Sequence, residues 1–366
     1  MKYSVSIFLF SASVTTFVNA APDDLFLTSQ QLNINSSKLN LSIGLDAVQD
    51  EIDIFNFKQS EGVSNESMGD YFGGHLKSSY RFNDHWQLEG SLWQREIDLS
   101  KDTNKIQSSS LSLRYTPDLQ LSKDQSLDVR LSFWGNKANE LTKSTPTNVN
   151  NRTIDKVSVM NPKDYQIQLD TIFSKKLDHM NLITGIVQFG YSKVEVDHVQ
   201  LQIKQHGCLI DLFINSSNQI KSKLAQKCEI DGFIVEEIDI QGNAKDFGLE
   251  VDKDLNYESY YAGFGGSWNW KYRKFESQLA YQYQYFWRND IDDRVSAFGS
   301  NPIKDNHSLG LKLNYEISPK VSSFVKGELY KNNFIGHIPF LYNGVTASRL
   351  DRKYGLASIG LQFKMF

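Results

Sequence analysis

The sequence predicts an all-β fold, a single transmembrane antiparallel β-barrel of about twelve strands, with fourteen strands as the alternative. Three observations predict it. Apolar residues recur at every second position in many separate stretches, which is the period of a strand with one apolar face. Beyond the N-terminal stretch, no apolar run approaches the length of a membrane-spanning helix. The connections between these stretches alternate between short and long, as in barrels with short periplasmic turns and long extracellular loops.

The N-terminal stretch, residues 1–20, has the composition of a secretory signal peptide. Lys2 supplies the positive start, an apolar stretch follows, and Ala20 closes a cleavage site of small residues. We therefore expect export and cleavage after Ala20. Residues 21–37 are then expected to form a polar lead in the periplasm, and residues 38–366 to form the barrel.

The alternating stretches define the strands in order. They lie at residues 39–45, 72–82, 86–92, 111–115, 127–133, 165–173, 183–191, 260–270, 275–287, 309–315, 321–329 and 354–366. Every second connection is short, at 83–85, 116–125, 175–179, 271–274 and 316–320. The chain therefore returns to the side from which it started. The stretch from Glu51 to Lys58 is ambiguous, since an extra strand pair there would raise the number to fourteen.

The last strand is the most regular of them. Ala357, Ile359, Leu361 and Phe363 fall on one face, with small or polar residues between them. This stretch resembles the C-terminal signal of Gram-negative outer-membrane β-barrels, in which alternating apolar residues close on an aromatic residue. Phe363 takes that place, and residues 364–366 follow as a tail out of register. The resemblance implies an outer-membrane location, contact with outer-membrane lipid, and recognition of this strand by the barrel assembly machinery.

Both cysteines lie in the longest polar insertion, residues 198–254. In an exported protein, Cys208 and Cys228 are expected to form a disulfide, which would stabilise the fold by roughly 3 kcal/mol. No CxxC or histidine pattern accompanies them, so we expect neither a metal nor a cofactor. The sequence leaves open whether this insertion folds inward as a plug or outward as a binding surface.

If the apolar positions face lipid, the alternate positions line the lumen, and many of these are charged. The basic ones are Lys77, Arg81, Arg95, Arg114, Arg130, Lys312 and Lys326. The acidic ones are Glu89, Asp128, Asp170 and Glu328. One interpretation is a track of cations that selects anions, similar in architecture to twelve-stranded porins for acidic oligosaccharides. The other is a salt-bridged lumen in which the acidic residues neutralise the cations and fix the shape of the barrel.

These features predict a porin-like channel for passive uptake of small polar solutes, with a preference for anions as a further hypothesis. The alternative is a surface-exposed binding or adhesion barrel whose loops carry the function. We do not expect an enzyme. Outer-membrane phospholipases and deacylases carry a His-x-Ser pair on one strand face, and none occurs here. Outer-membrane aspartyl-type proteases use an Asp-x-His arrangement, whereas the Asp-His pairs of this chain are adjacent and would point to opposite strand faces. The net charge of −4 also argues against nucleic acid as a partner.

Overall fold

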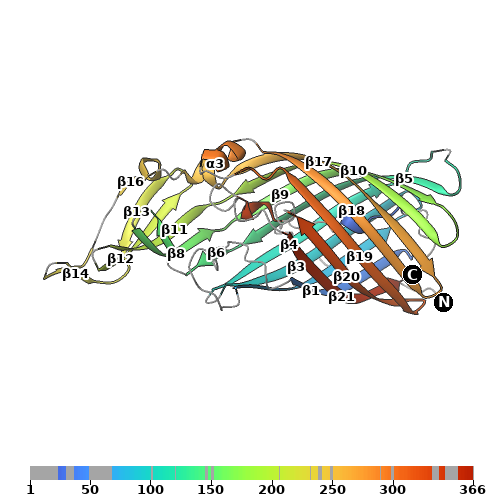
Figure 1. Ribbon diagram of the computed structural model, residues 1–366, viewed down its shortest axis with the longest axis horizontal. Helices are drawn as coiled ribbons and strands as arrows, with labels where there is room; N and C mark the ends of the chain where they lie inside the picture. Colours follow the sequence, from blue (N-terminus) through green and yellow to red (C-terminus); the bar gives the residue numbers. More distant parts are fainter. Residues whose placement is uncertain are drawn as a thin grey trace, which may run out of the picture.

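The computed structural model describes residues 24–29, 37–48, 68–99, 102–119, 121–144, 147–149, 152–205, 207–230, 232–237, 241–247, 250–288, 290–297, 301–331, 338–342 and 353–365. Its centre is a closed antiparallel barrel of twelve strands, shown in Figure 1. The barrel strands are β1 (Leu39–Val48), β2 (Met68–Arg81), β3 (Trp86–Leu99), β4 (Asp102–Tyr115), β5 (Gln125–Ala138), β9 (Lys163–Lys176), β10 (Asn181–Glu195), β17 (Tyr257–Tyr272), β18 (Phe275–Arg288), β19 (Asp305–Ser318), β20 (Val321–Lys331) and β21 (Lys353–Met365). The predicted twelve-stranded barrel is confirmed, and the ambiguous stretch Glu51 to Lys58 lies outside the described residues.

Tight turns join the strands at one end, which we call the turn end; the opposite end is the loop end. At the turn end β1 begins and β21 finishes, and the two strands pair with each other to close the barrel. The prediction that residues 364–366 form a tail out of register is wrong for the first two of them. Lys364 and Met365 continue the ladder opposite Asn40 and Leu39, because β1 begins at that level and offers its backbone as a partner.

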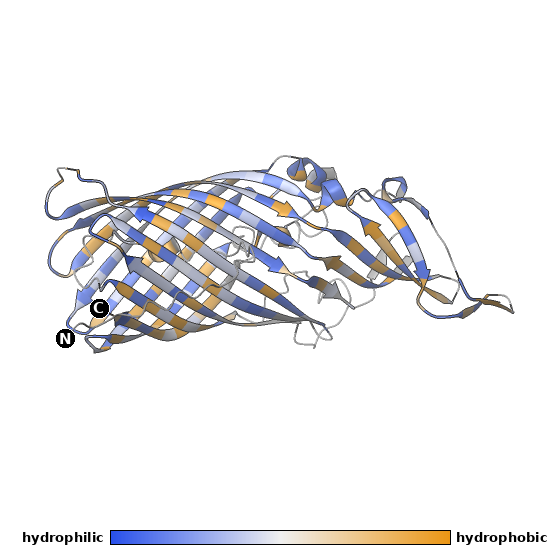
Figure 2. Cartoon of the chain, turned by 180° about the vertical axis from the view of Figure 1, so that it is seen from behind, coloured by the Kyte–Doolittle hydropathy of each residue, from blue (hydrophilic) through white to orange (hydrophobic). Residues whose placement is uncertain are grey.

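The outside of the barrel is apolar. In β9, for example, Leu169 and Phe173 are exposed, whereas Gln168 and Asp170 between and beside them are buried inside. Figure 2 shows the resulting alternation of hydrophobic and hydrophilic residues along the strands. Exposed aromatic residues lie toward the turn end at Phe82, Trp86, Trp268, Phe275 and Tyr315, and toward the loop end at Phe72, Tyr260 and Trp287. An outward apolar band flanked by aromatic residues is the architecture of an outer-membrane β-barrel.

The predicted signal strand belongs to this band. In β21, Ala357 and Ile359 are exposed on the outer face, and Leu361 and Phe363 follow them on the same face. Among the described residues, no helix has both the length and the apolar character needed to cross a membrane.

Two of the connections at the loop end fold together into a second sheet. Its seven strands are β6 (Glu140–Lys143), β7 (Thr147–Val149), β8 (Arg152–Met160), β11 (His198–Gln205), β12 (Cys208–Asn215), β13 (Gln219–Leu224) and β16 (Gln241–Asn243). Figure 1 shows this sheet extending beyond the loop end, away from the tight turns. The insertion at residues 198–254, whose direction the sequence left open, therefore builds outward.

A buried apolar cluster holds the second sheet together. Val199, Ile214 and Ile220 from three of its strands pack with Val251 of α2 (Val251–Asp254). The predicted disulfide joins Cys208 to Cys228, the first residue of a hairpin made by β14 (Cys228–Ile230) and β15 (Phe233–Val235).

Candidate functional site

The candidate site is the lumen, because all the predicted lumen residues occupy inward-facing positions of their strands. Seven of them are buried: Arg95, Arg114, Arg130, Asp128, Asp170, Lys326 and Glu328. The other four are half-buried: Lys77, Arg81, Glu89 and Lys312. The period-two pattern predicts the face of the strand on which each side chain lies, but it says nothing about the partners of these side chains.

Five of these residues form one ion-pair cluster across strands β3, β4, β5 and β9. Glu89 accepts hydrogen bonds from both guanidinium groups, with Oε1 2.8 Å from Arg114 Nη2 and Oε2 2.9 Å from Arg130 Nε. Arg130 Nη1 also lies 3.0 Å from Asp170 Oδ2, and Arg114 Nη1 lies 3.6 Å from Asp128 Oδ2. Arg114 and Arg130 are therefore held by carboxylates, as the salt-bridged interpretation describes.

Two of the remaining predicted cations also have close partners. Lys326 pairs with Glu328 at 2.9 Å. Arg95 donates to Ser108 Oγ at 2.8 Å and stacks its guanidinium 4.5 Å from the centre of the Trp93 ring. These contacts fix the side chains in place, since each charge is compensated by an anion, a hydroxyl or an aromatic face.

A buried network that was not predicted from the sequence surrounds Asp46. This carboxylate accepts a hydrogen bond from Trp93 Nε1 at 2.7 Å and one from Ser358 Oγ at 2.5 Å. It also lies 2.7 Å from His75 Nδ1. The signal was present, because Asp46 and His75 both stand at inward positions between apolar outward neighbours.

An aromatic cluster fills the lumen toward the loop end. It consists of Trp93, Trp134, Tyr261 and Phe286, all buried. Tyr261 donates to Gln168 Oε1 at 2.9 Å, and a Cβ on Gly190 would lie only 2.1 Å from the Tyr261 ring, so glycine is required there. These residues were not predicted to line the lumen, because apolar side chains were expected to face lipid, although each stands at an inward position of its strand.

Beyond the aromatic cluster, a short buried segment lies in the lumen near its loop end, against β9 and β10. This mouth segment, residues 338–342, contains the short helix η3 (Pro339–Leu341) and is almost fully buried. Tyr257 donates to the Pro339 carbonyl at 2.7 Å, and Tyr342 donates to Asp292 Oδ1 at 3.1 Å. Asp292 belongs to α3 (Ile291–Ala297), and burial raises its pKa although Arg288 opposes the rise. The mouth segment therefore occupies part of the lumen near its loop end.

A second segment enters the lumen from the N-terminal side. This plug segment, residues 24–29, includes the 3₁₀ helix η1 (Asp24–Phe26), which touches β17, β18 and β19. Arg114 donates to the Thr28 carbonyl at 2.7 Å, and Gln278 donates to the Phe26 carbonyl at 3.0 Å. Ser29 donates its amide to Ser174 Oγ at 2.9 Å and its hydroxyl to Ser126 Oγ at 2.5 Å.

The position of the plug segment differs from the prediction that residues 21–37 form a polar lead in the periplasm. Residues 24–29 lie inside the barrel, because polar lumen side chains satisfy their backbone groups and Leu25 finds an apolar contact over Gly310. A run of three apolar residues, Leu25 to Leu27, within an otherwise polar lead was the available signal.

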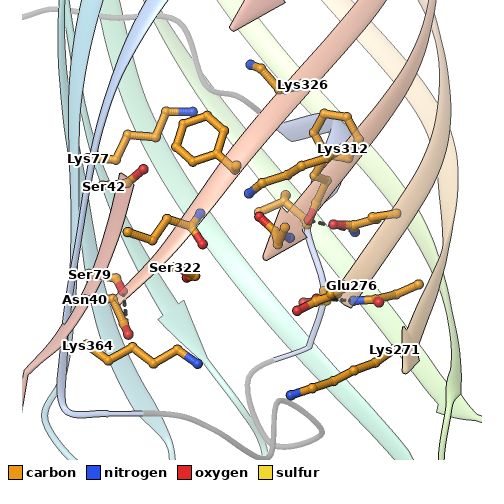
Figure 3. A pocket seen from close by; sticks show the side chains of 18 of the residues that line it. Asn40, Ser42, Lys77, Ser79, Lys271, Glu276, Lys312, Ser322, Lys326 and Lys364 are labelled. Atoms are coloured by element: carbon orange, nitrogen blue, oxygen red, sulfur yellow. Dashed lines mark hydrogen bonds between the residues drawn. The ribbon is translucent and has the colours of Figure 1, made fainter. Parts of the chain in front are cut away.

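Between the plug segment and the turn end lies a cavity of about 640 Å³, drawn in Figure 3. Nine of its lining residues are Lys or Arg and four are Asp or Glu. Figure 3 shows Lys77, Lys312, Lys271 and Lys364 directed into one space from different strands. Because turn residues such as Lys274 also line it, the cavity reaches the turn end. Its excess of cations makes it attractive to anions.

Among the residues that the structure describes, no group of three or more His, Cys, Asp or Glu is arranged to hold a metal ion.

A search of protein-family models finds no match, and neither does a search of curated proteins. Solved structures of similar shape exist. The NanC porin is 10% identical with a TM-score of 0.41, over 89% of this chain and 100% of that one. The translocator domain of the autotransporter NalP from Neisseria meningitidis is 9% identical with a TM-score of 0.48, over 91% and 90%. Outer membrane phospholipase A from Escherichia coli is 10% identical with a TM-score of 0.34, over 88% and 92%.

All three TM-scores are below 0.5, so the description rests on the strand order and the lipid-facing exterior of this chain. The chain is an outer-membrane β-barrel with an occupied lumen.

Proposed function

We propose that the protein is a gated outer-membrane channel for small polar solutes, with a preference for anions, and that the lumen described above is its closed state. The observation that carries this proposal is the cation-rich cavity, which opens at the turn end and ends at the plug segment. A barrel with a purely structural role would be stabilised by a filled lumen, whereas this lumen contains a cavity lined by cations from several strands.

Two barriers separate this cavity from the loop end. The plug segment is held by a few hydrogen bonds and the contact of Leu25, whereas the aromatic cluster and mouth segment are packed more tightly. Passage of a solute requires both to move, and loops of this kind are the elements that move most readily in barrels.

The proposed anion preference comes from the cavity and not from the ion-pair cluster. Arg114 and Arg130 already face carboxylates. Lys271, Lys274 and Lys364 lie near the turn end, where a ring of cations raises the local concentration of anions.

Swelling of proteoliposomes tests the proposal. We expect liposomes containing the protein to admit an acidic monosaccharide faster than its neutral counterpart. Replacing Lys271, Lys274 and Lys364 with Gln should reduce that ratio, whereas the same change at Lys221 and Lys223, on the second sheet, should leave it unchanged. Absence of swelling with either sugar, in barrels shown to be folded, would count against a channel.

A second candidate function has its own observation. The hairpin β14–β15 exposes Phe233 and Ile234, which are 77% and 72% accessible, although both are large apolar residues. Such exposed side chains on a disulfide-anchored loop are typical of binding surfaces. If the loops carry the function, replacing both residues with Ser should abolish adhesion of cells that display the protein, while the barrel itself shows no conductance.

A further inference from the structure

The outer wall of the barrel contains an apolar groove of about 570 Å³ that the channel function does not use. Small residues form its floor on three adjacent strands, and leucines form its sides. The floor residues are Ala47, Gly327, Gly355 and Ala357. The side residues are Leu279, Leu309, Leu311 and Leu329, and all four are exposed on the outer face.

The strand register places a polar cluster beside this groove. Leu309 is paired with Leu329, and two residues farther toward the loop end His307 is paired with Lys331. Lys331 in turn is paired with Lys353 of β21. The leucines of the groove are therefore followed, two residues along each of these strands, by ionisable residues.

Hydrogen bonds organise this cluster. Tyr281 Oη lies 2.8 Å from His307 Nδ1, and Asp305 Oδ2 lies 3.1 Å from His307 Nε2 and 3.7 Å from Lys331 Nζ. The side chains of His307 and Asp305 are each 37% exposed, and that of Lys331 is 44% exposed. Groups that carry charge thus stand on the outer face, immediately above the apolar band.

We propose that this groove and its polar cluster form a binding site for a phosphorylated, multiply acylated lipid of the outer leaflet. One acyl chain lies over the small residues between the leucines. The phosphate lies at the loop-end edge, where the exposed Lys331 ammonium group can donate to it.

Charge favours this occupant over a second copy of the chain. The Lys331 side chain is 44% exposed at the loop-end edge of the groove, where its ammonium group can meet an anionic headgroup. Asp305 is the acidic residue that contacts Lys331 among the contacts described, and it also contacts His307. A second barrel packed against the groove would bury these charges in the membrane, whereas a lipid phosphate neutralises them at the interface.

The test is native mass spectrometry of the full-length protein in detergent with lipid A, with and without its phosphates. An added Cβ at Gly327 meets nothing within 4 Å, so Gly327→Leu fills the groove without disturbing the fold. Gly185→Leu is the matched control, because Gly185 is also exposed with nothing within 4 Å and lies on β10. Lys331→Gln removes the proposed phosphate-binding cation. Its matched control is Lys175→Gln, at the turn end of β9.

We expect retention of phosphorylated lipid A to fall at least tenfold in Gly327→Leu and severalfold in Lys331→Gln, with both controls unchanged. Removing the phosphates should weaken binding to the unmodified protein and abolish the effect of Lys331→Gln. Equal retention by Gly327→Leu and Gly185→Leu would overturn the proposal. So would a dimer of the unmodified protein that Gly327→Leu dissociates, because the groove would then be an interface between copies.

Discussion

Gly310→Val should release the plug segment from the lumen. Gly310 lies on the inner face of β19, and a Cβ there would come within 2.6 Å of Leu25 Cδ2 and 2.6 Å of Phe26 Cζ. A valine cannot share this space with both side chains, so the segment must shift or leave. Gly327→Val, one strand away on the outer face, is the control, since it meets nothing within 4 Å.

The docked plug segment is close to balance with the undocked one. Its hydrogen bonds and the burial of Leu25 favour docking by about 7 kcal/mol together. Ordering the backbone of residues 24–29 costs about 6–12 kcal/mol. Overpacking at Gly310 costs about 1–3 kcal/mol, which corresponds to a shift of roughly 5–150-fold toward the undocked state.

Thiol labelling measures this shift. Ser29 is buried, and Ser29→Cys introduces a single reactive thiol because Cys208 and Cys228 are joined in a disulfide. The rate of maleimide labelling should rise in Gly310→Val toward that of a fully exposed thiol and stay unchanged in Gly327→Val. Equal rates in the two variants, both folded, would refute the assignment of residues 24–29 as a displaceable plug.

Three further predictions concern stability. Arg130→Gln should lower the free energy of unfolding in urea by about 3–5 kcal/mol at neutral pH, because it leaves carboxylates buried without their partner. The deficit should shrink in acid, where those carboxylates can be protonated, and a deficit that grows in acid would contradict the assignment. Cys208→Ser should lower the stability of the second sheet by roughly 3 kcal/mol, which limited proteolysis would measure. The heat-modifiable gel shift of the barrel should persist. Gly190→Val should destabilise the barrel by about 1–3 kcal/mol by colliding with the aromatic cluster, and Gly185→Val, which meets open space, should not; equal midpoints of thermal unfolding would count against this packing.

The barrel could be predicted from the sequence because its determinants are local. A period of two fixes which face of each strand meets lipid, and turn residues such as Asn83 and Pro319 mark where strands reverse. Closure then follows from an even number of strands, since an open edge cannot be tolerated in lipid.

The contents of the lumen could not be predicted in the same way, because they depend on which inward side chains meet across the barrel. Arg114 and Arg130 look like selectivity groups in the sequence, but Glu89 reaches both of them from a neighbouring strand. Neutralising them would therefore test stability before it tested ion preference. The lysines near the turn end are better targets for selectivity.

The second sheet also escaped prediction, for a different reason. β8 and β11 come from separate connections and pair over a long sequence separation. The alternation of Val199, Leu201 and Ile203 was readable as a strand, but its partner was not.

The most direct test of the central claim is planar-bilayer conductance in a salt gradient, comparing the full-length protein with a variant that lacks residues 24–29. We expect brief, infrequent openings for the full-length protein and longer, more frequent openings for the variant, both with an anion-selective reversal potential. Identical closed behaviour of both proteins, or a cation-selective current, would contradict it.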